Sequence, residues 1–413
     1  MSTIRDASLA PLGLQRIAWV REFMPVLSTL EARFSKAKPL AGLKVAVCIH
    51  LEAKTAFFAL LLREAGAEVC VTGSNPLSTK DDICAALASL GMQVHAWFGA
   101  TDAEYREHLR RTLEFCPHII IDDGGDFVHM LTEEHPECAV NLIGGCEETT
   151  TGLQRLRARV QNSTLPFPML AVNDANSKHL FDNRHGTGQS VWAAVMDATN
   201  NMVTGRTVVV AGYGFCGSGI ATRAKGLGAS VIVTEVNPYR ALEAAMDGFR
   251  VMRMDDAAAL GDIFITATGC KDVIVKRHFE KMKNNTILAN AGHFDVEFNI
   301  KHLRALAQRV EERKPFIDGY YLSDGRVINV LAEGRLVNIV AGNGHPADIM
   351  DMSFAIQALC AVYLAEHGGG LENKLYDVPE AIDREVAMLK VAAMQLGLDM
   401  LTPEQQNYVI GQE

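Results

Sequence analysis

The chain has 413 residues, of which 48% are hydrophobic and 21% charged, and its formal net charge is −10 at pH 7. This composition is ordinary for a globular protein of two or three domains, and the acidic balance argues against nucleic acid or an anionic membrane as a partner. The nine cysteines show no CxxC pair and no zinc-ligand spacing, so we expect no metal site and a reducing cytoplasm.

The N-terminus is not typical of a signal peptide, because Arg5, Asp6 and Arg16 interrupt the apolar run that such a peptide requires. No uncharged apolar stretch is long enough to cross a bilayer, so we expect no membrane partner. The first regular element is a helix predicted over 14–34 from the spacing of its apolar residues.

Strands and helices then alternate up to a polar turn, Asp122-Asp123-Gly124-Gly125-Asp126. This alternation predicts a doubly wound parallel sheet. Strands are expected over 43–49, 68–71, 93–97 and 118–121, and helices over 55–65, 79–90 and 102–115.

A second alternating run begins near residue 190 and predicts a complete dinucleotide-binding unit. After residue 348 the pattern becomes helical, and the charged tail contains one expected helix. The predicted strands are 207–210, 230–234, 263–266, 286–290 and 326–331, and the predicted helices are 190–202, 217–227, 349–366 and 379–396.

The sequence Gly212-Tyr213-Gly214-Phe215-Cys216-Gly217 joins a predicted strand to a predicted helix. In this context the glycines allow a tight turn, a close approach to a pyrophosphate, and close packing of helix on strand. Glu235 ends the next strand and would accept hydrogen bonds from a ribose diol, which favours NAD over NADP. The alternative is a structural glycine turn in another kind of α/β domain.

Several short motifs, in order along nearly the whole chain, resemble those of the S-adenosyl-L-homocysteine hydrolase family. A generic dehydrogenase would share only the glycine loop. The matching segments are DDGGD at 122–126, EETTTG at 147–152, VND at 172–174, FDN at 181–183, VVAGYG at 209–214, GHFDVE at 292–297, AEGRLVN at 332–338 and GHP at 344–346.

The resemblance implies an α/β fold of two doubly wound, Rossmann-like parallel-sheet domains with a cleft between them and a short C-terminal extension. We expect a substrate-binding domain over 1–188 and 346–385 and an NAD-binding domain over 189–345. The segment 386–413 is expected at a subunit interface, because the family is usually tetrameric; the partner would be a homo-oligomer, tetramer or dimer.

The resemblance also implies NAD-dependent, reversible hydrolysis of an S-nucleosyl-L-homocysteine to a nucleoside and L-homocysteine. The 3′-hydroxyl is oxidised to a ketone, which acidifies the 4′ proton. Elimination then expels homocysteine, water adds, and the ketone is reduced again. The alternative from another class is an oxidoreductase with net hydride transfer, and a non-catalytic homologue is disfavoured because the acidic and basic site residues are present.

The site residues that the resemblance implies fall into three groups. The catalytic group is Asp123, Lys178, Asp182, His50, His293 and Glu148. The substrate-binding group is Glu52, Lys54, Thr55, His345 and Asn343. The cofactor-binding group is Thr149, Thr150, Thr151, Asn183, Gly212, Tyr213, Gly214, Phe215, Gly217, Glu235, Asn290 and Asn338. Taken alone, Lys178 has the ordinary alternative of a solvated charge on a helix surface.

The sequence departs from the common family form at the expected base site. Glu52 and Lys54 stand where that form has Thr and Glu, as in a branch that includes S-inosyl-L-homocysteine hydrolases. Lysine only donates hydrogen bonds and ionised glutamate only accepts them, so the pair fits adenine in one arrangement and hypoxanthine in the other. A third alternative is that the two side chains pair with each other. S-adenosyl-L-homocysteine is the leading substrate and the inosyl compound the alternative.

Two further departures concern Thr187, where the common form has Cys, and Asn343, where it has Met. A reactive thiol at position 187 is therefore not required. The chain also ends TPEQQNYVIGQE, whereas many members continue with a tail containing Lys and Tyr that reaches a neighbouring subunit's NAD. We expect NAD to exchange more readily here if that tail contributes to its retention.

Overall fold

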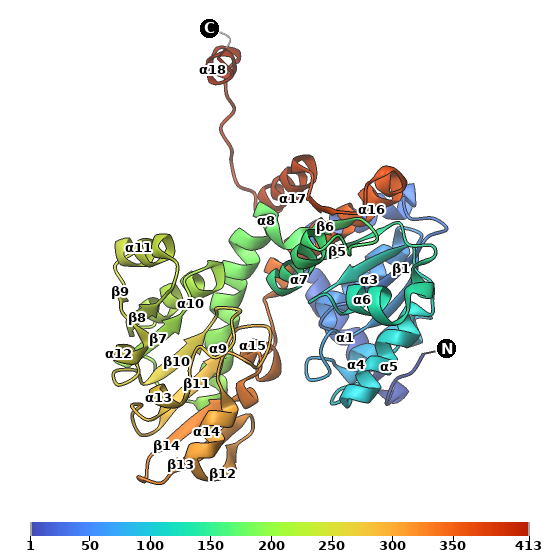
Figure 1. The fold of residues 1–413 in the computed structure, drawn as a ribbon. Helices are drawn as coiled ribbons and strands as arrows, with labels where there is room; N and C mark the ends of the chain where they lie inside the picture. Colours follow the sequence, from blue (N-terminus) through green and yellow to red (C-terminus); the bar gives the residue numbers. More distant parts are fainter. Residues whose placement is uncertain (1, 412–413) are drawn as a thin grey trace.

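The computed structural model describes residues 2–411 and contains two β-sheets placed side by side (Figure 1). The first is a seven-stranded, all-parallel sheet in the order β15-β6-β5-β4-β1-β2-β3. Its strands are β1 Lys44–Cys48, β2 Glu68–Thr72, β3 Gln93–Val94, β4 Ile119–Asp122, β5 Gly144–Glu147, β6 Met169–Ala171 and β15 Leu375–Asp377.

Two hydrophobic cores cover the faces of this first sheet. The alternation of side chains along each strand sends Ile119 and Ile121 into one core and Ile120 into the other. One face packs against α1 Ala10–Glu22, α2 Pro25–Ala37, α3 Ala53–Glu64, α4 Asp81–Ser89, α16 Ala347–His367 and α17 Glu380–Ala393, and the other against α5 Asp102–Leu113, α6 Asp126–His129 and α7 Thr150–Gln161.

The single helix predicted over 14–34 is wrong, because two helices, α1 and α2, share that segment. Pro25 occupies the first position of α2, and Phe23 and Met24 leave helical geometry before it. Proline has no N–H to donate to the preceding turn, so a continuous helix cannot pass through this position. The spacing of apolar residues nevertheless continues across the break, because Met24 and Leu27 are buried in the same core.

The second sheet has eight strands in the order β12-β13-β14-β11-β10-β7-β8-β9. Six run parallel, and a hairpin of β12 and β13 adds two antiparallel strands at one edge. The strands are β7 Thr207–Ala211, β8 Ser230–Thr234, β9 Arg250–Val251, β10 Ile263–Thr266, β11 Thr286–Asn290, β12 Ala307–Lys314, β13 Ile317–Leu322 and β14 Val327–Leu331.

This edge hairpin was not predicted from the sequence. Strand β12 has the sequence AQRVEERK and is largely exposed, so it lacks the buried apolar run by which the other strands were predicted. Charged side chains on an edge strand also discourage pairing with further strands.

The helices of this second unit surround its sheet and connect it to the first. A short helix, α8 Asn176–Lys178, continues through a π-helical segment His179–Gly186 into α9 Thr187–Thr199. The remaining helices are α10 Phe215–Gly226, α11 Pro238–Met246, α12 Met254–Ala257, α13 Lys276–Phe279, α14 Ile300–Leu306 and α15 Val337–Val340. The chain thus passes between the two sheets once near α8–α9 and again between α15 and α16, while the domain boundaries themselves stay a prediction.

One segment, Ala347–Gly370, is long and apolar enough by length and composition to cross a membrane, although Asp351 and Glu366 leave it no uncharged stretch of that length. Its most apolar window is 72% buried inside the protein. The α16 helix also carries a fully buried carboxylate, Asp351, which pairs with Lys390 at 3.0 Å and accepts hydrogen bonds from the Val26 and Leu27 amides. These contacts identify α16 as a core helix of the first unit.

The C-terminal segment extends away from both units (Figure 1). The helix expected over 379–396 is α17, which ends at Ala393, and a further helix, α18 Pro403–Val409, follows an extended stretch. Exposed apolar side chains lie along this arm: Leu396, Leu398, Met400, Leu401, Tyr408, Val409 and Ile410.

The close packing of α10 against the π-helical segment predicts that glycine-to-alanine substitutions at two positions of this helix differ in their effect on stability. A Cβ added at Gly219 would lie 1.8 Å from the Arg184 carbonyl oxygen, whereas one added at Gly226 would meet no atom within 4 Å. We expect Gly219→Ala to lower the free energy of unfolding by about 1–3 kcal/mol. Gly226→Ala should be neutral or slightly stabilising, since alanine favours helix by about 1 kcal/mol. Thermal unfolding of both variants measures this, and equal midpoints would contradict the described packing.

Candidate active site

A cavity of about 960 Å³ lies between the two sheets and takes residues from both. His50 follows β1, Asp123 follows β4 and Glu148 follows β5 in the first unit, while Gly212 follows β7 and Glu235 follows β8 in the second. In open α/β sheets the carboxyl ends of the strands form the ligand-binding edge. Here two such edges face the same cavity, so one ligand can contact both units.

The structure brings nearly all the residues expected at the site to this cavity. Twenty of them line it: His50, Glu52, Lys54, Thr55, Asp123, Glu148, Thr149, Thr150, Thr151, Lys178, Asp182, Asn183, Gly212, Gly214, Phe215, Glu235, His293, Asn338, Asn343 and His345. Tyr213, Gly217 and Asn290 do not.

These three residues lie outside the cavity lining and support the loops that form it. The Tyr213 hydroxyl is bonded to Asp247 at 2.6 Å. A Cβ on Gly217 would lie 2.0 Å from the Gly212 carbonyl oxygen, so only glycine lets α10 begin this close to the loop. Asn290 is fully buried, and its amide donates to the carbonyls of Gly292, Phe294 and Gly334. It therefore holds the loop that carries His293.

Lys178 is buried between two carboxylates, so the alternative of a solvated surface charge is wrong. Its Nζ lies 3.2 Å from Asp182 Oδ1 and 3.5 Å from Glu148 Oε1, and donates to Asn183 Oδ1 at 2.9 Å. Burial alone would lower the pKa of Lys178, but the charges of Asp182 and Glu148 outweigh this effect and raise that pKa. Burial likewise opposes ionisation of Asp182, yet Lys178 and His345 lower the pKa of that carboxyl.

Two side chains of α16 that the sequence analysis missed complete this cluster. Ser353 Oγ donates to Asp182 Oδ2 at 2.7 Å, and Gln357 Nε2 donates to Glu148 Oε2 at 2.6 Å. They stand four residues apart, so they share one helix face. The only signal in the sequence was a pair of polar residues within a long apolar helix. Burial raises the pKa of Glu148 to about 7, although Lys178 and the Gln357 hydrogen bond lower it.

His345 connects the cluster to the first residue of α9. Its Nδ1 lies 2.9 Å from Asp182 Oδ1, and its Nε2 lies 3.1 Å from Thr187 Oγ1. Thr187 Oγ1 also lies 3.6 Å from the Cys216 sulfur. A thiol from the glycine loop thus lies beside Thr187, the position at which the common family form has its own cysteine.

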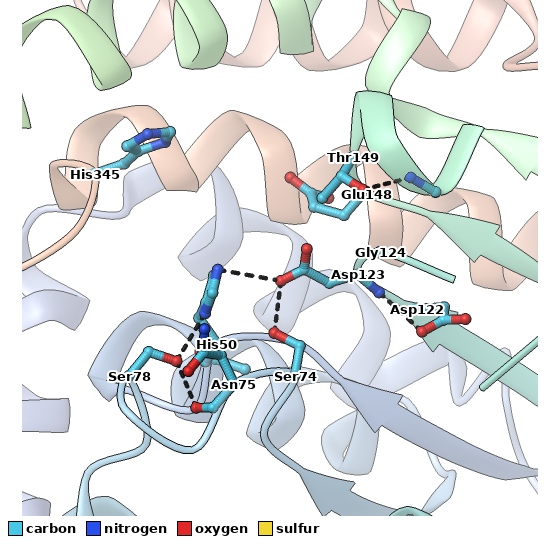
Figure 2. Close-up of polar contacts among 12 residues, drawn as sticks. His50, Ser74, Asn75, Ser78, Asp122, Asp123, Gly124, Glu148, Thr149 and His345 are labelled. Atoms are coloured by element: carbon cyan, nitrogen blue, oxygen red, sulfur yellow. Dashed lines mark hydrogen bonds and ion pairs between the residues drawn. The ribbon is translucent and has the colours of Figure 1, made fainter. Parts of the chain in front are cut away.

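A second polar cluster lies across the cavity, around His50 (Figure 2). His50 Nδ1 is bonded to Ser78 Oγ at 2.7 Å, and its Nε2 lies 3.6 Å from Asp123 Oδ2. Ser74 Oγ donates to the same Asp123 oxygen at 2.8 Å. Burial lowers the pKa of His50 despite the opposing effect of Asp123, which favours a neutral imidazole that can accept a proton. The His293 ring lies 6.5 Å from the His50 ring, centroid to centroid.

Glu52 and Lys54 are paired with each other, which is the third alternative considered from the sequence. Lys54 Nζ lies 3.0 Å from Glu52 Oε2 and donates to the Asn343 carbonyl at 3.2 Å. Glu52 also caps α3 by accepting from the Lys54 amide at 3.2 Å. Both side chains still line the cavity, so the pair presents one donor and one acceptor to a ligand.

The glycine loop is held by Glu235, whose oxygens accept from three backbone amides. Tyr213 N donates to one oxygen at 2.7 Å, and Val236 N and Asn237 N donate to the other at 2.6 and 2.9 Å. Gly212 has a φ of 93°, a conformation that favours glycine. The loop leads directly into α10, whose first amides can meet a pyrophosphate.

The far end of this half of the cavity also fits a dinucleotide. The Asn338 amide donates to Ser190 Oγ at 3.0 Å, and its buried Oδ1 has no hydrogen-bond partner among residues 2–411. An unpartnered buried carbonyl favours a ligand that donates to it, as a nicotinamide carboxamide would. The loop therefore fits the pyrophosphate of NAD, and Asn338 fits its nicotinamide end.

Comparison with known proteins matches both parts of the chain to one family. The family model for "S-adenosyl-L-homocysteine hydrolase" matches residues 1–137, and the model for its "NAD binding domain" matches residues 183–344. The chain is therefore similar to this family on both sides of the cavity, and NAD is the cofactor that the matched domain binds.

Individual relatives are similar over nearly their full lengths. The S-inosyl-L-homocysteine hydrolase of Methanocaldococcus jannaschii is 52% identical over 409 residues, covering 99% of this chain and 98% of the relative. The adenosylhomocysteinase of Thermococcus kodakarensis is 53% identical over 406 residues, covering 98% and 96%. The adenosylhomocysteinase of Aquifex aeolicus is 51% identical over 407 residues, covering 98% and 97%.

The geometry of Glu235 predicts how the site depends on it. In Glu235→Gln, an amide NH2 replaces one of two oxygens that both accept backbone N–H groups, so at least one hydrogen bond is lost. We expect NAD to bind about 5- to 150-fold more weakly, from a loss of about 1–3 kcal/mol. Titration of the cofactor-free protein with NAD measures this. Glu311→Gln, on strand β12 away from the cavity and paired with Arg309, is the control, and unchanged affinity in Glu235→Gln would contradict the role.

Proposed function

The chain belongs to the S-adenosyl-L-homocysteine hydrolase family, and on that premise we propose that it hydrolyses an S-nucleosyl-L-homocysteine, reversibly and with bound NAD, to a nucleoside and L-homocysteine. The observation that carries this proposal is the buried Lys178–Asp182–Glu148 cluster in the same cavity as the NAD loop. A plain dehydrogenase would need the loop, but not a second cluster of His50 and Asp123 on the opposite wall.

Bound NAD supplies a hydride acceptor and donor for one ribose carbon within a single turnover. Lys178 stabilises the negative charge that develops on the 3′ oxygen as its proton leaves. Asp182, held by Ser353 and His345, fixes the position of the Lys178 ammonium group. Glu148 presents an oxygen with no hydrogen-bond partner in the described chain, which can accept from a ribose hydroxyl.

The groups on the opposite wall handle the protons of the later steps. Once the 3′ carbon is a ketone, the 4′ proton is acidic enough for a protein base to remove. Asp123 has one buried oxygen without a partner among residues 2–411 and is the base in this proposal. His50 and His293 carry the protons of the departing thiolate and the entering water, because a neutral imidazole nitrogen can accept a proton and pass it on.

The base of the nucleoside is assigned to the Glu52–Lys54 pair. We take S-adenosyl-L-homocysteine as the leading substrate and S-inosyl-L-homocysteine as the alternative; both names occur among the relatives. Either base must separate the two side chains, which lie 3.0 Å apart, before it can bind them. Each base then fits the donor of Lys54 and the acceptor of Glu52 in only one arrangement.

A homo-oligomer is the proposed state, with the C-terminal arm as part of its interface. Support comes from the apolar residues that α18 and its linker leave exposed, including Met400 at 90% and Tyr408 at 74%. Exposed apolar groups of this size are typical of contact surfaces. We also propose a reducing cytoplasm as the compartment, because all nine cysteines are free thiols.

Replacing Lys178 tests the proposed chemistry. Lys178→Ala should lower kcat by at least about 100-fold, since it removes electrostatic stabilisation of the 3′ oxyanion. NAD content of the purified variant should stay close to that of the wild type, because Lys178 is positioned by the first unit. Homocysteine release measures turnover, and Lys225→Ala, an exposed lysine on α10, is the control. Continuous accumulation of free NADH by the wild-type protein would instead identify an oxidoreductase with net hydride transfer.

The Glu52–Lys54 pair predicts a strong base preference. A base whose hydrogen-bond order mismatches the pair leaves buried polar groups unpaired, so we expect kcat/KM for the adenosyl and inosyl substrates to differ by at least about 100-fold. Lys54→Gln should reduce the difference in kcat/KM between the two substrates, since an amide side chain can present either a donor or an acceptor to the base. Steady-state homocysteine release from both substrates measures this. Equal kcat/KM values for the wild-type protein would contradict the assignment.

A further inference from the structure

Two buried acids lie side by side directly behind the carboxylates of the site. Asp122 is the last residue of β4 and Glu147 the last of β5, and the two are paired in the strand register. Paired residues of neighbouring strands project from the same face of a sheet. Neither acid has any exposed surface. Each immediately precedes a residue of the site, Asp123 and Glu148.

No cation neutralises this pair in the described part of the chain, residues 2–411. Arg155 on α7 is engaged elsewhere, since its Nη1 donates to the Gly124 carbonyl at 2.8 Å and pairs with Asp126 at 2.9 Å. Two adjacent carboxylates cannot both be ionised in a buried, unpaired environment. The pair therefore retains a proton at neutral pH.

The hydrogen bonds indicate which acid holds that proton. Both oxygens of Asp122 accept backbone N–H groups, from Asp123 and Val128, each at 3.0 Å. All donors to Glu147 converge on Oε1: the Gly124 amide at 2.9 Å, the Thr149 amide at 2.9 Å and the Thr149 hydroxyl at 2.8 Å. Its Oε2 is buried with no partner. Glu147 Oε2 is thus the one oxygen of the four that accepts no hydrogen bond, and a proton there displaces no donor, so the proton belongs on Glu147 Oε2 and the charge on Asp122.

The surroundings favour the same assignment. The groups that face the pair are Asp123 and Asp126 from the β4–α6 turn, Glu148 after β5, Cys48 on β1, Tyr105 on α5 and Arg155 on α7. Apart from Arg155, which is engaged with Asp126, all are acids or neutral. Burial, followed by the charge of Asp122, raises the pKa of Glu147 well above its usual range, and burial with Asp126 raises that of Asp122 to about 7.

We propose that Glu147 is a positioning residue that acts as a neutral carboxylic acid, tying the turn that carries Asp123 to the segment that carries Glu148. Its Oε1 bridges the amides of Gly124 and Thr149, one from each segment. The space around it is closed, since a Cβ on Gly152 would lie 2.0 Å from Glu147 Cδ. The two site carboxylates thereby keep a fixed separation across the cavity wall. The activity part of this inference rests on the proposed function, whereas the part concerning the proton does not.

A pair of substitutions of equal length separates the neutral acid from an ionised one. Glutamine keeps an oxygen at the bridging position and carries no charge, whereas methionine keeps the volume but accepts no strong hydrogen bond. We expect Glu147→Gln to keep kcat/KM for homocysteine release within about threefold of wild type, and Glu147→Met to lose at least about tenfold, because Gly124 and Thr149 lose their acceptor. Loss of activity in Glu147→Gln as large as in Glu147→Met would overturn the proposal.

Thermal unfolding without substrate tests the proton by itself. A group whose folded-state pKa is raised contributes stability below its unfolded pKa and loses it as pH rises through the folded pKa. The wild-type midpoint should therefore fall relative to that of Glu147→Gln as pH rises above about 4.5, the ordinary pKa of glutamate, because Glu147→Gln has no proton to lose. The two midpoints should agree best at about pH 4, where Glu147 is protonated in both the folded and the unfolded chain.

Asp122→Asn tests the assignment of the proton within the pair. An amide there places an NH2 group against the N–H of Asp123 or Val128, so we expect a lower unfolding midpoint at every pH. If instead the midpoint of Asp122→Asn gains on that of the wild type as pH rises and the midpoint of Glu147→Gln does not, the proton lies on Asp122 and the proposal is wrong. If the midpoints behave as expected but no homocysteine is released by the wild type, the proposed function fails and the neutral Glu147 stands.

Discussion

The buried ammonium group of Lys178 is the constraint on which the rest of this structure depends. A cation can be kept out of water only when opposite charges and hydrogen bonds replace its hydration. Asp182, Glu148 and Asn183 supply these contacts within 3.5 Å. Each of these partners must in turn be fixed. The polar side chains of α16 fix the two carboxylates, and Asn183 accepts from Lys178 while donating to Asn173 at 3.1 Å.

The fold brings these groups together by placing the carboxyl edges of two sheets on one cavity. The π-helical segment at His179–Gly186 carries Asp182 and Asn183 inward, and π-helical turns often occur where helices carry functional residues. The chain then crosses to the second sheet and returns through α15 and α16, so helix α16, late in the sequence, packs beneath the first site segments. A ligand in the cavity therefore meets residues from both ends of the chain.

Acidic groups in this protein are arranged in two layers with different protonation. The front layer, Asp182 and Asp123, faces a cation or a histidine in the cavity. The back layer, Asp122 and Glu147, has no cation and shares one negative charge in our proposal. The backbone amides of Asp123 and Gly124 donate to the two acids of the back layer, so the protonation of the back layer influences the position of the turn that carries Asp123.

The sequence by itself determined the strands with continuous apolar runs, the glycine loop and the family motifs, because each is a local pattern of neighbouring residues. It identified Lys178, Asp182, Asp123 and Glu148 as a set, but not how they contact one another. Only the tertiary structure decided that Ser353 and Gln357 hold Asp182 and Glu148, since these partners stand 171 and 209 residues apart. It likewise decided that Glu52 pairs with Lys54 and that Asn290 lies behind the cavity. Local patterns report periodicity and motif, whereas hydrogen-bond partners and burial depend on which distant segments the fold places together.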